Sequence, residues 1–154
     1  MRVSVSKTEY KRRFTKAADT AKWAITMAKV RIRQAVAQKP WPRWHFVEFR
    51  GKEGGESRGV VDIVAIRKDH SERACRELGT KRGDALQIVL IQVKGGCAAK
   101  PTAEDAKRLQ SVARQHNACA VLLGVWKPGK GVQFYYLDKR AEWAEVTDLA
   151  TIFC

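Results

Sequence analysis

Three polar residues interrupt two apolar segments of this 154-residue chain. Asp62 lies within the segment Val60–Ile66, and both Gln92 and Lys94 lie at the end of the segment Leu86–Lys94. The two segments have the length and β-branched composition of strands, which normally avoid such polar groups. Side chains alternate across a strand, so Gln92 and Lys94 should point to the same face. If the two strands pair, a carboxylate, an amide oxygen and an ammonium group converge, which suits a divalent metal and a phosphate.

This set of groups matches what phosphodiester hydrolysis requires. A divalent cation must neutralise charge on the phosphate and activate a water molecule. Mg²⁺, or Mn²⁺ in its place, is satisfied by one or two carboxylates together with neutral oxygens, water and the phosphate itself. Asp62 would be a direct ligand, and the side-chain oxygen of Gln92 and the main-chain carbonyl of Val93 would be neutral ligands. Lys94 would orient the attacking water and help to deprotonate it.

Because Gln92 is neutral, the expected metal site is short of one negative charge. Glu48 is the preferred second acid, since its expected strand, Trp44–Arg50, should lie next to that of Asp62. Glu56 is the alternative acid, closer to Asp62 in the sequence but located in a glycine-rich connection.

The charge of the chain points to a polyanionic partner. Thirty Lys and Arg against 16 Asp and Glu give a net charge of +14, which favours nucleic acid, and DNA first, over an anionic membrane. Up to Arg43 there are twelve Lys and Arg and only two acids, a difference of +10, although such a run can also be no more than a solvated face. The residues expected to contact the nucleic acid are Lys11, Arg12, Arg13, Lys16 and Arg58.

The order of the expected elements indicates a single α/β domain over residues 1–154, with a central mixed sheet flanked by helices. A long basic helix over residues 6–38 begins with a capping-box pattern and ends before two prolines. A core over residues 44–137 follows. The expected elements of this core and of the C-terminal segment are strands at 44–50, 60–66, 86–94, 119–126 and 132–137, a polar hairpin excursion at 69–84, a helix at 102–116, and a short strand or coil with a terminal helix over 140–154.

The cysteines and the hydropathy pattern indicate in which cellular compartment the protein is expected. The four cysteines lie far apart without a C-x-x-C motif, which indicates free thiols in a reducing cytosol rather than a zinc site. The apolar segments are too short to span a bilayer, and the basic N-terminus lacks the apolar stretch of a signal peptide. We therefore expect a cytoplasmic protein without a membrane partner.

The segment Gly59–Ala65 followed by Ile91–Gly95 resembles the core of the PD-(D/E)XK nuclease superfamily, most closely its small Holliday-junction-resolvase-like and VRR-NUC-like members. In that family a carboxylate opens one strand of a hairpin and an acid-x-Lys triplet ends the next, after which a helix and two more strands follow. The resemblance covers roughly residues 44–137. Val61 stands where the family usually has Pro, and Gln92 stands where it usually has an acid, although some members show these departures.

This resemblance implies a restriction-endonuclease-like core and nuclease activity. The family often takes a further acid from its N-terminal helix, where the only Glu is Glu9, which we interpret as a helix cap. Gln110 resembles a family position that can touch the site, although a polar residue on an amphipathic helix is more often simply exposed.

Together these features predict a Mg²⁺- or Mn²⁺-dependent DNA endonuclease that attacks with a metal-activated water. A homodimer is expected if the protein makes paired cuts. One alternative is a DNA-binding protein that keeps a nuclease fold but whose Gln92 has weakened or abolished catalysis. The other is a nuclease-fold subunit of a recombination, transposition or defence assembly.

Overall fold

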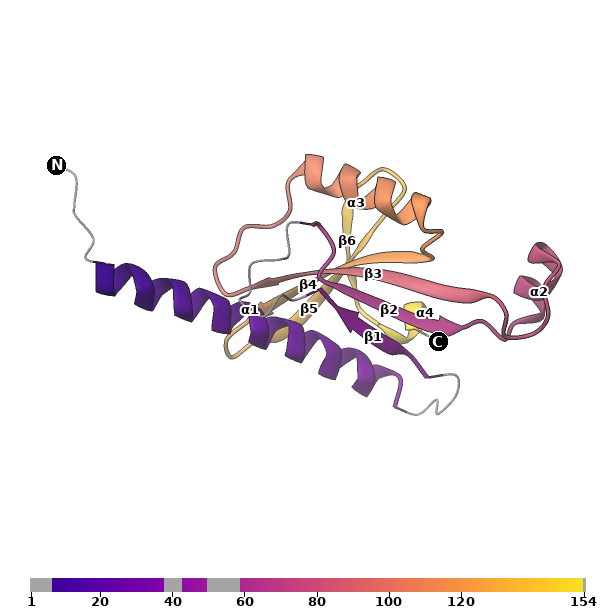
Figure 1. The fold of residues 1–154 in the computed structure, drawn as a ribbon, viewed down its shortest axis with the longest axis horizontal. Coiled ribbons are helices and arrows are strands. Elements are labelled where there is room, and N and C mark those ends of the chain that lie inside the picture. The colour runs from indigo at the N-terminus through magenta and orange to yellow at the C-terminus, as the bar shows by residue number, and fades with distance from the viewer. Residues whose placement is uncertain (1–6, 38–42, 50–58, 154) are drawn as a thin grey trace.

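Six strands form one mixed sheet and follow each other across it in sequence order, from β1 to β6 (Figure 1). The computed structural model describes residues 7–37, 43–49 and 59–153. Neighbouring strands are antiparallel except for β3 and β4, which are parallel and connected through helix α3. The elements are α1 (Lys7–Ala35), β1 (His45–Glu48), β2 (Ile63–Lys68), α2 (Glu72–Leu78), β3 (Leu86–Gly95), α3 (Ala103–Gln115), β4 (Ala120–Lys127), β5 (Gly131–Leu137), β6 (Trp143–Val146) and α4 (Ala150–Phe153).

The predicted fold class is confirmed: this is a single α/β domain with helices packed on a mixed sheet. The prediction for the connection at 69–84 was incomplete, because helix α2 forms inside it. Ser71 caps this helix by accepting a hydrogen bond from the Ala74 N–H, and Gly79 ends it in the left-handed conformation. The local signals for this short helix were its two caps, together with Glu72 in its first turn and Arg76 in its last turn.

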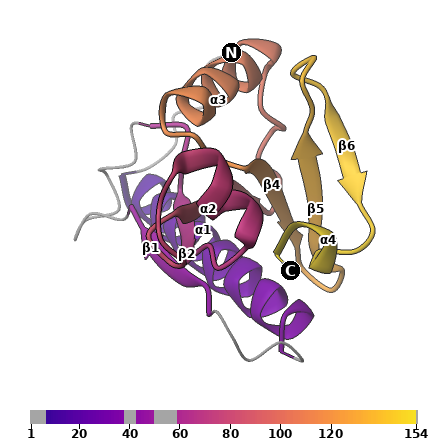
Figure 2. The same ribbon diagram turned by 90° about the vertical axis from the view of Figure 1, so that its right-hand side faces the viewer.

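Helices α1 and α3 cover opposite faces of the sheet, as Figures 1 and 2 show. We call these the α1 face and the α3 face. Alternating residues of β3 divide between them, so Val89 and Ile91 join the core under α1 while Leu90 joins the core under α3. At one end of the α1 face the buried Trp44 donates its indole N–H to the Phe153 carbonyl of α4 at 2.7 Å.

Helix α1 crosses the end of β3 at close range. A Cβ added to Gly95 would lie 2.9 Å from the Cβ of Ala24 and 3.1 Å from the Thr20 carbonyl oxygen, so only glycine fits without a shift of the helix. Towards the N-terminus from this crossing, α1 extends beyond the sheet (Figure 1). With a rise of about 1.5 Å per residue, the extension from Lys7 to Asp19 is roughly 20 Å long.

The Gly95→Ala substitution should therefore lower the free energy of unfolding by about 1–3 kcal/mol, because it overpacks the contact with α1. Urea unfolding measures this change. The matched control is Gly59→Ala, where an added Cβ meets nothing closer than the Val61 nitrogen at 4.0 Å and the free energy should change by less than about 0.5 kcal/mol. Equal stability of the two variants would contradict the close crossing.

In the described part of the chain, no helix combines the length and the apolar character needed to cross a membrane.

Candidate functional site

The carboxylate of Asp62 is held between β2 and β3 where their pairing begins. The first regular pair of the two strands is Ile63 with Ile91. One residue earlier, the Asp62 N–H donates to the Ile91 carbonyl at 3.0 Å, and Asp62 Oδ2 accepts a hydrogen bond from the Val93 N–H at 2.7 Å. The Val93 N–H thus donates to a side-chain oxygen of Asp62 instead of to a main-chain carbonyl of β2. This bond fixes the carboxylate beside the end of β3.

Gln92 lies next to this carboxylate and is buried. Because Ile63 pairs with Ile91, Asp62 lies beside Gln92. The side chain of Gln92 shares the α3 face with Leu90 by strand alternation, and only 6% of Gln92 is exposed. Within the part of the chain that the structure describes, Gln92 Oε1 has no hydrogen-bond partner. An unsatisfied buried acceptor costs about 1–3 kcal/mol, so this oxygen is ready to accept a cation or a donor.

Lys94 follows on the same strand face and is half-buried. Its ammonium group lies within electrostatic reach of the first turn of α3, where it helps to lower the pKa of Asp105. Hydrogen bonds from Thr102 are the main cause of that lowered pKa, since Asp105 and Thr102 form a reciprocal capping box. Asp105 is an acid near Lys94 that was not among the predicted site residues, although the T-x-x-D spacing marks it as a capping residue.

Glu48 lies on the strand next to that of Asp62, as predicted, but its side chain points to the α1 face. Strand β1 pairs with β2, as expected, and Glu48 is opposite Ile63, which belongs to the core under α1. The carboxylate of Glu48 forms a salt bridge with Lys29 of α1. The structure therefore places Glu48 one strand from Asp62, with its side chain on the face opposite to that of Gln92.

The Lys29–Glu48 pair should contribute to stability, because the two side chains are only 18% and 20% exposed. We expect Glu48→Gln to lower the free energy of unfolding by about 1–3 kcal/mol, since it leaves Lys29 partly buried without its anion. A urea double-mutant cycle with Lys29→Met measures the coupling. The exposed Arg73–Glu77 pair of α2 is the matched control and should show no comparable coupling. A Lys29–Glu48 coupling as small as that of the control would contradict a structural role for Glu48.

The other predicted residues fall into two groups. Gln110 contacts the β5–β6 connection, where its Nε2 donates to the Asp138 and Lys139 carbonyls at 3.1 and 2.9 Å, so it holds α3 to that connection. Lys16 is exposed on α1. The remaining predictions lie outside what the structure describes, either as whole residues (Glu56 and Arg58) or as side chains (Glu9, Lys11, Arg12 and Arg13).

Positive charge surrounds the end of β3 that carries the site. Strands β3 and β4 are parallel, so their C-terminal ends share one edge of the domain. Tyr135 on the neighbouring β5 is covered there by a lysine ammonium group 4.5 Å from the ring centre. The lysines at or near this edge are Lys94, Lys100, Lys127, Lys130 and, on the extension of α1, Lys16.

The oxygen donors fit a hard cation. Among the described residues no group of three or more His, Cys, Asp or Glu side chains gathers in a metal-binding arrangement. The available set is the Asp62 carboxylate, the Gln92 amide oxygen and the Val93 carbonyl, which suits Mg²⁺ or Mn²⁺ better than zinc. Comparison with protein-family models and with curated proteins finds no match for this chain.

Proposed function

We propose that this protein is a metal-dependent nuclease that hydrolyses phosphodiester bonds in DNA. The observation that carries the proposal is the unpartnered, buried Gln92 Oε1 beside the Asp62 carboxylate, at the lysine-rich end of β3. A core position would normally hold an apolar residue or a satisfied amide. Here an acceptor is left open next to an anion, which is the pattern of a cation site.

Each residue has a distinct part in the proposed reaction. Asp62, Gln92 and the Val93 carbonyl would hold Mg²⁺ or Mn²⁺, which when bound supplies charge neutralisation and an acidified water. The Val93 N–H fixes the orientation of the Asp62 carboxylate. Lys94 places a positive charge beside the phosphate and orients the water that attacks it. The carboxylate of Glu48 lies on the α1 face, where it bonds to Lys29, so the proposed reaction uses no acid from β1.

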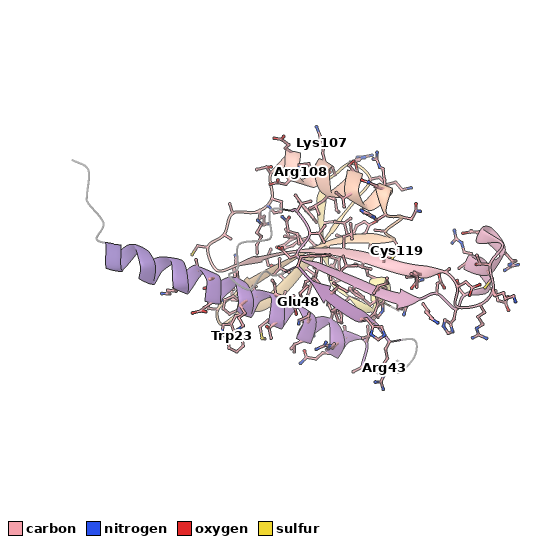
Figure 3. All side chains as sticks on the ribbon, viewed as in Figure 1. Trp23, Arg43, Glu48, Lys107, Arg108 and Cys119 are labelled. Atoms are coloured by element: carbon pink, nitrogen blue, oxygen red, sulfur yellow. The ribbon has the colours of Figure 1, made fainter. Side chains whose placement is uncertain are left out.

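The extended half of α1 would hold the DNA. Nucleic-acid backbones are bound mainly through Lys and Arg contacts to phosphates, which fix position without reading sequence. On the same helix Trp23, labelled in Figure 3, is 59% exposed, so its ring can stack on a base. Helix α1 meets β3 at Gly95, one residue from Lys94, so a phosphate backbone on the extension would lie at the same end of β3 as the site.

Metal-dependent cleavage tests this proposal directly. Supercoiled, linear and single-stranded DNA and RNA are incubated with the protein in Mg²⁺, Mn²⁺ or EDTA. We expect cleavage of DNA that EDTA abolishes and that Lys94→Ala slows by about 10²- to 10³-fold. Lys107→Ala, at an exposed position of α3, is the matched control and should cut at the wild-type rate (Figure 3). Cleavage that persists in EDTA, or a Lys94→Ala variant as active as the control, would contradict the proposal.

A second candidate is a nuclease-fold protein that binds DNA without cutting it, alone or as a subunit of a larger assembly. The observation that favours it is that, among the described residues, only Asp62 brings a carboxylate to Gln92, since Glu48 is engaged by Lys29 on the other face. This candidate predicts that wild type binds DNA but leaves it intact in every metal. If the protein is an enzyme, wild type cuts DNA without a further acidic side chain being introduced at the site. Light scattering would then measure the mass of the protein bound to DNA and show whether a homodimer makes the cuts.

A further inference from the structure

A cavity of about 460 Å³ lies at the opposite end of β2 from Asp62. Its lining includes Arg43, Lys68 and Arg82 together with two imidazoles, His45 and His70. From Asp62 to Lys68 the chain advances six residues along the strand, roughly 20 Å at about 3.3 Å per residue. None of the cavity residues therefore belongs to the candidate metal site.

Strand pairing places the lining groups on one surface. His45 is opposite Ile66, and Lys68 is opposite Leu86, so these four side chains share the α3 face. Helix α3 does not cover this end, where Leu86 is 53% exposed. The cavity therefore has an apolar floor of Ile66 and Leu86 with basic groups at its rim.

The turn before β3 brings the remaining basic groups to this rim. The Asp69 N–H donates to the Ala85 carbonyl at 2.8 Å, and the Gly83 N–H donates to the Asp69 carbonyl at 3.3 Å. Gly83 has a φ of +83°, and a Cβ there would lie 3.3 Å from His70 Nε2. This turn therefore packs against the His70 ring, and Arg82 is held beside it.

The cations of the rim lack counter-charges. Among the described residues, no carboxylate forms an ion pair with Arg43, Lys68 or Arg82. Asp69, next to Lys68, accepts hydrogen bonds from the Ser71 N–H and from Gln87 Nε2. Partial burial opposes ionisation of Asp69, but these hydrogen bonds outweigh it and keep its pKa below the usual value. Asp84, two residues after Arg82, accepts a hydrogen bond from the Lys81 N–H at 3.0 Å.

Arg67 also lines the cavity, but its guanidinium group is engaged elsewhere. It bonds to Gln87 Oε1 at 2.6 Å and to the Phe153 carbonyl at 3.1 Å, and it lies over the Trp44 ring. Three other cations thus face one small volume without an anion, an arrangement that repels itself until an anion binds.

We propose that this cavity binds a phosphate group carried on a nucleotide. Arg and Lys are the usual partners of phosphate, and imidazole N–H groups add neutral donors. The volume exceeds that of a bare phosphate and falls in the range of small-ligand sites, and the apolar floor offers a surface for the attached base or sugar. The nucleotide is either free or part of a nucleic-acid strand. This site does not depend on nuclease activity, because it uses no residue of the metal centre.

The histidines provide a direct probe, because the chain contains only three, His45, His70 and His116. The first two line the cavity, while His116 is exposed at the end of α3. In ¹H–¹³C NMR spectra of the metal-free protein, titration with adenosine monophosphate or pyrophosphate should shift the His45 and His70 ring signals saturably and leave His116 in place. Lys68→Gln/Arg82→Gln should weaken the apparent affinity by at least about tenfold. Lys139→Gln/Arg140→Gln, in the β5–β6 connection, should bind as wild type does.

Oligonucleotides with and without a terminal phosphate distinguish the two sources. Shifts with mononucleotide alone assign a free ligand, and shifts with either oligonucleotide assign a strand. A requirement for the terminal phosphate would assign a strand end rather than an internal linkage. Absence of saturable shifts with every ligand, equal shifts of His116, or unchanged binding by a folded Lys68→Gln/Arg82→Gln variant would overturn the proposal. Loss of DNA cleavage by Asp62 variants would leave these results unaffected.

Discussion

Replacing Asp62 by Asn should slow metal-dependent DNA cleavage by about 10²- to 10³-fold or more, while DNA binding changes little. Asn keeps the shape of the side chain and an oxygen that can accept the Val93 hydrogen bond, so the strand junction should survive. What the substitution removes is the negative charge. Among the described residues, Asp62 is the carboxylate that accepts the Val93 N–H at the site. The affinity of a hard cation depends strongly on the negative charge of its ligands.

Single-turnover cleavage with saturating protein measures this effect free of any change in DNA affinity. Asp148→Asn is the matched control, since it makes the same chemical change at an exposed position between β6 and α4. Urea unfolding of both variants separates a catalytic loss from a folding defect. An Asp62→Asn variant that is folded and cuts as fast as Asp148→Asn would show that the metal is held elsewhere.

The basic residues on the extension of α1 should control the affinity for DNA. Neutralising Lys11, Arg12 and Arg13 to Gln should reduce DNA affinity by roughly 10²-fold at 0.1 M salt. Each phosphate contact contributes about 0.9 to the slope of log K against log salt, so three lost contacts should flatten the slope by about 2.7. The loss should be nearly independent of DNA sequence, because backbone contacts carry no base information.

Fluorescence anisotropy across a range of salt concentrations provides both the affinity and the slope. Lys139→Gln/Arg140→Gln removes two exposed charges at the opposite end of the sheet and should leave the slope nearly unchanged. If the α1 variant and this control lose affinity equally, the α1 extension is not a specific phosphate-binding surface. A flattened slope with unchanged cleavage at low salt would separate the binding role of α1 from the chemistry of Asp62.

Much of the fold follows from local sequence signals. The three-to-four-residue spacing of apolar side chains predicted the long helix that is found at Lys7–Ala35, and Thr102 with Asp105 marked the start of α3 through its capping box. The strands of the core were predicted from β-branched and apolar segments, from the alternation at 44–50 and from the turn before 132–137. Strand β2 begins at Ile63 rather than Val60, because the Asp62 carboxylate takes the Val93 N–H and interrupts the ladder.

The candidate site was less accessible to sequence reasoning, because it depends on register. A shift of one residue moves a side chain to the opposite face of a sheet, so the adjacency of β1 and β2 could be predicted but the α1 face of Glu48 could not. Its partner Lys29 is nineteen positions away and is one of many lysines on α1. Likewise the burial of Gln92 results from the packing of α3 over the sheet, and its unpartnered oxygen has no local signature.

Direct measurement of Mn²⁺ binding tests whether Asp62 and Gln92 form a metal site. In electron paramagnetic resonance titrations, wild type should bind one Mn²⁺ per chain at the site, and Asp62→Asn should lose that binding. Gln92→Glu adds a negative charge beside Asp62 and should bind Mn²⁺ at least about tenfold more tightly, because affinity for hard cations rises with ligand charge. A wild-type protein that binds no Mn²⁺, or an Asp62→Asn variant that binds it as tightly as wild type, would contradict a metal centre at the junction of β2 and β3.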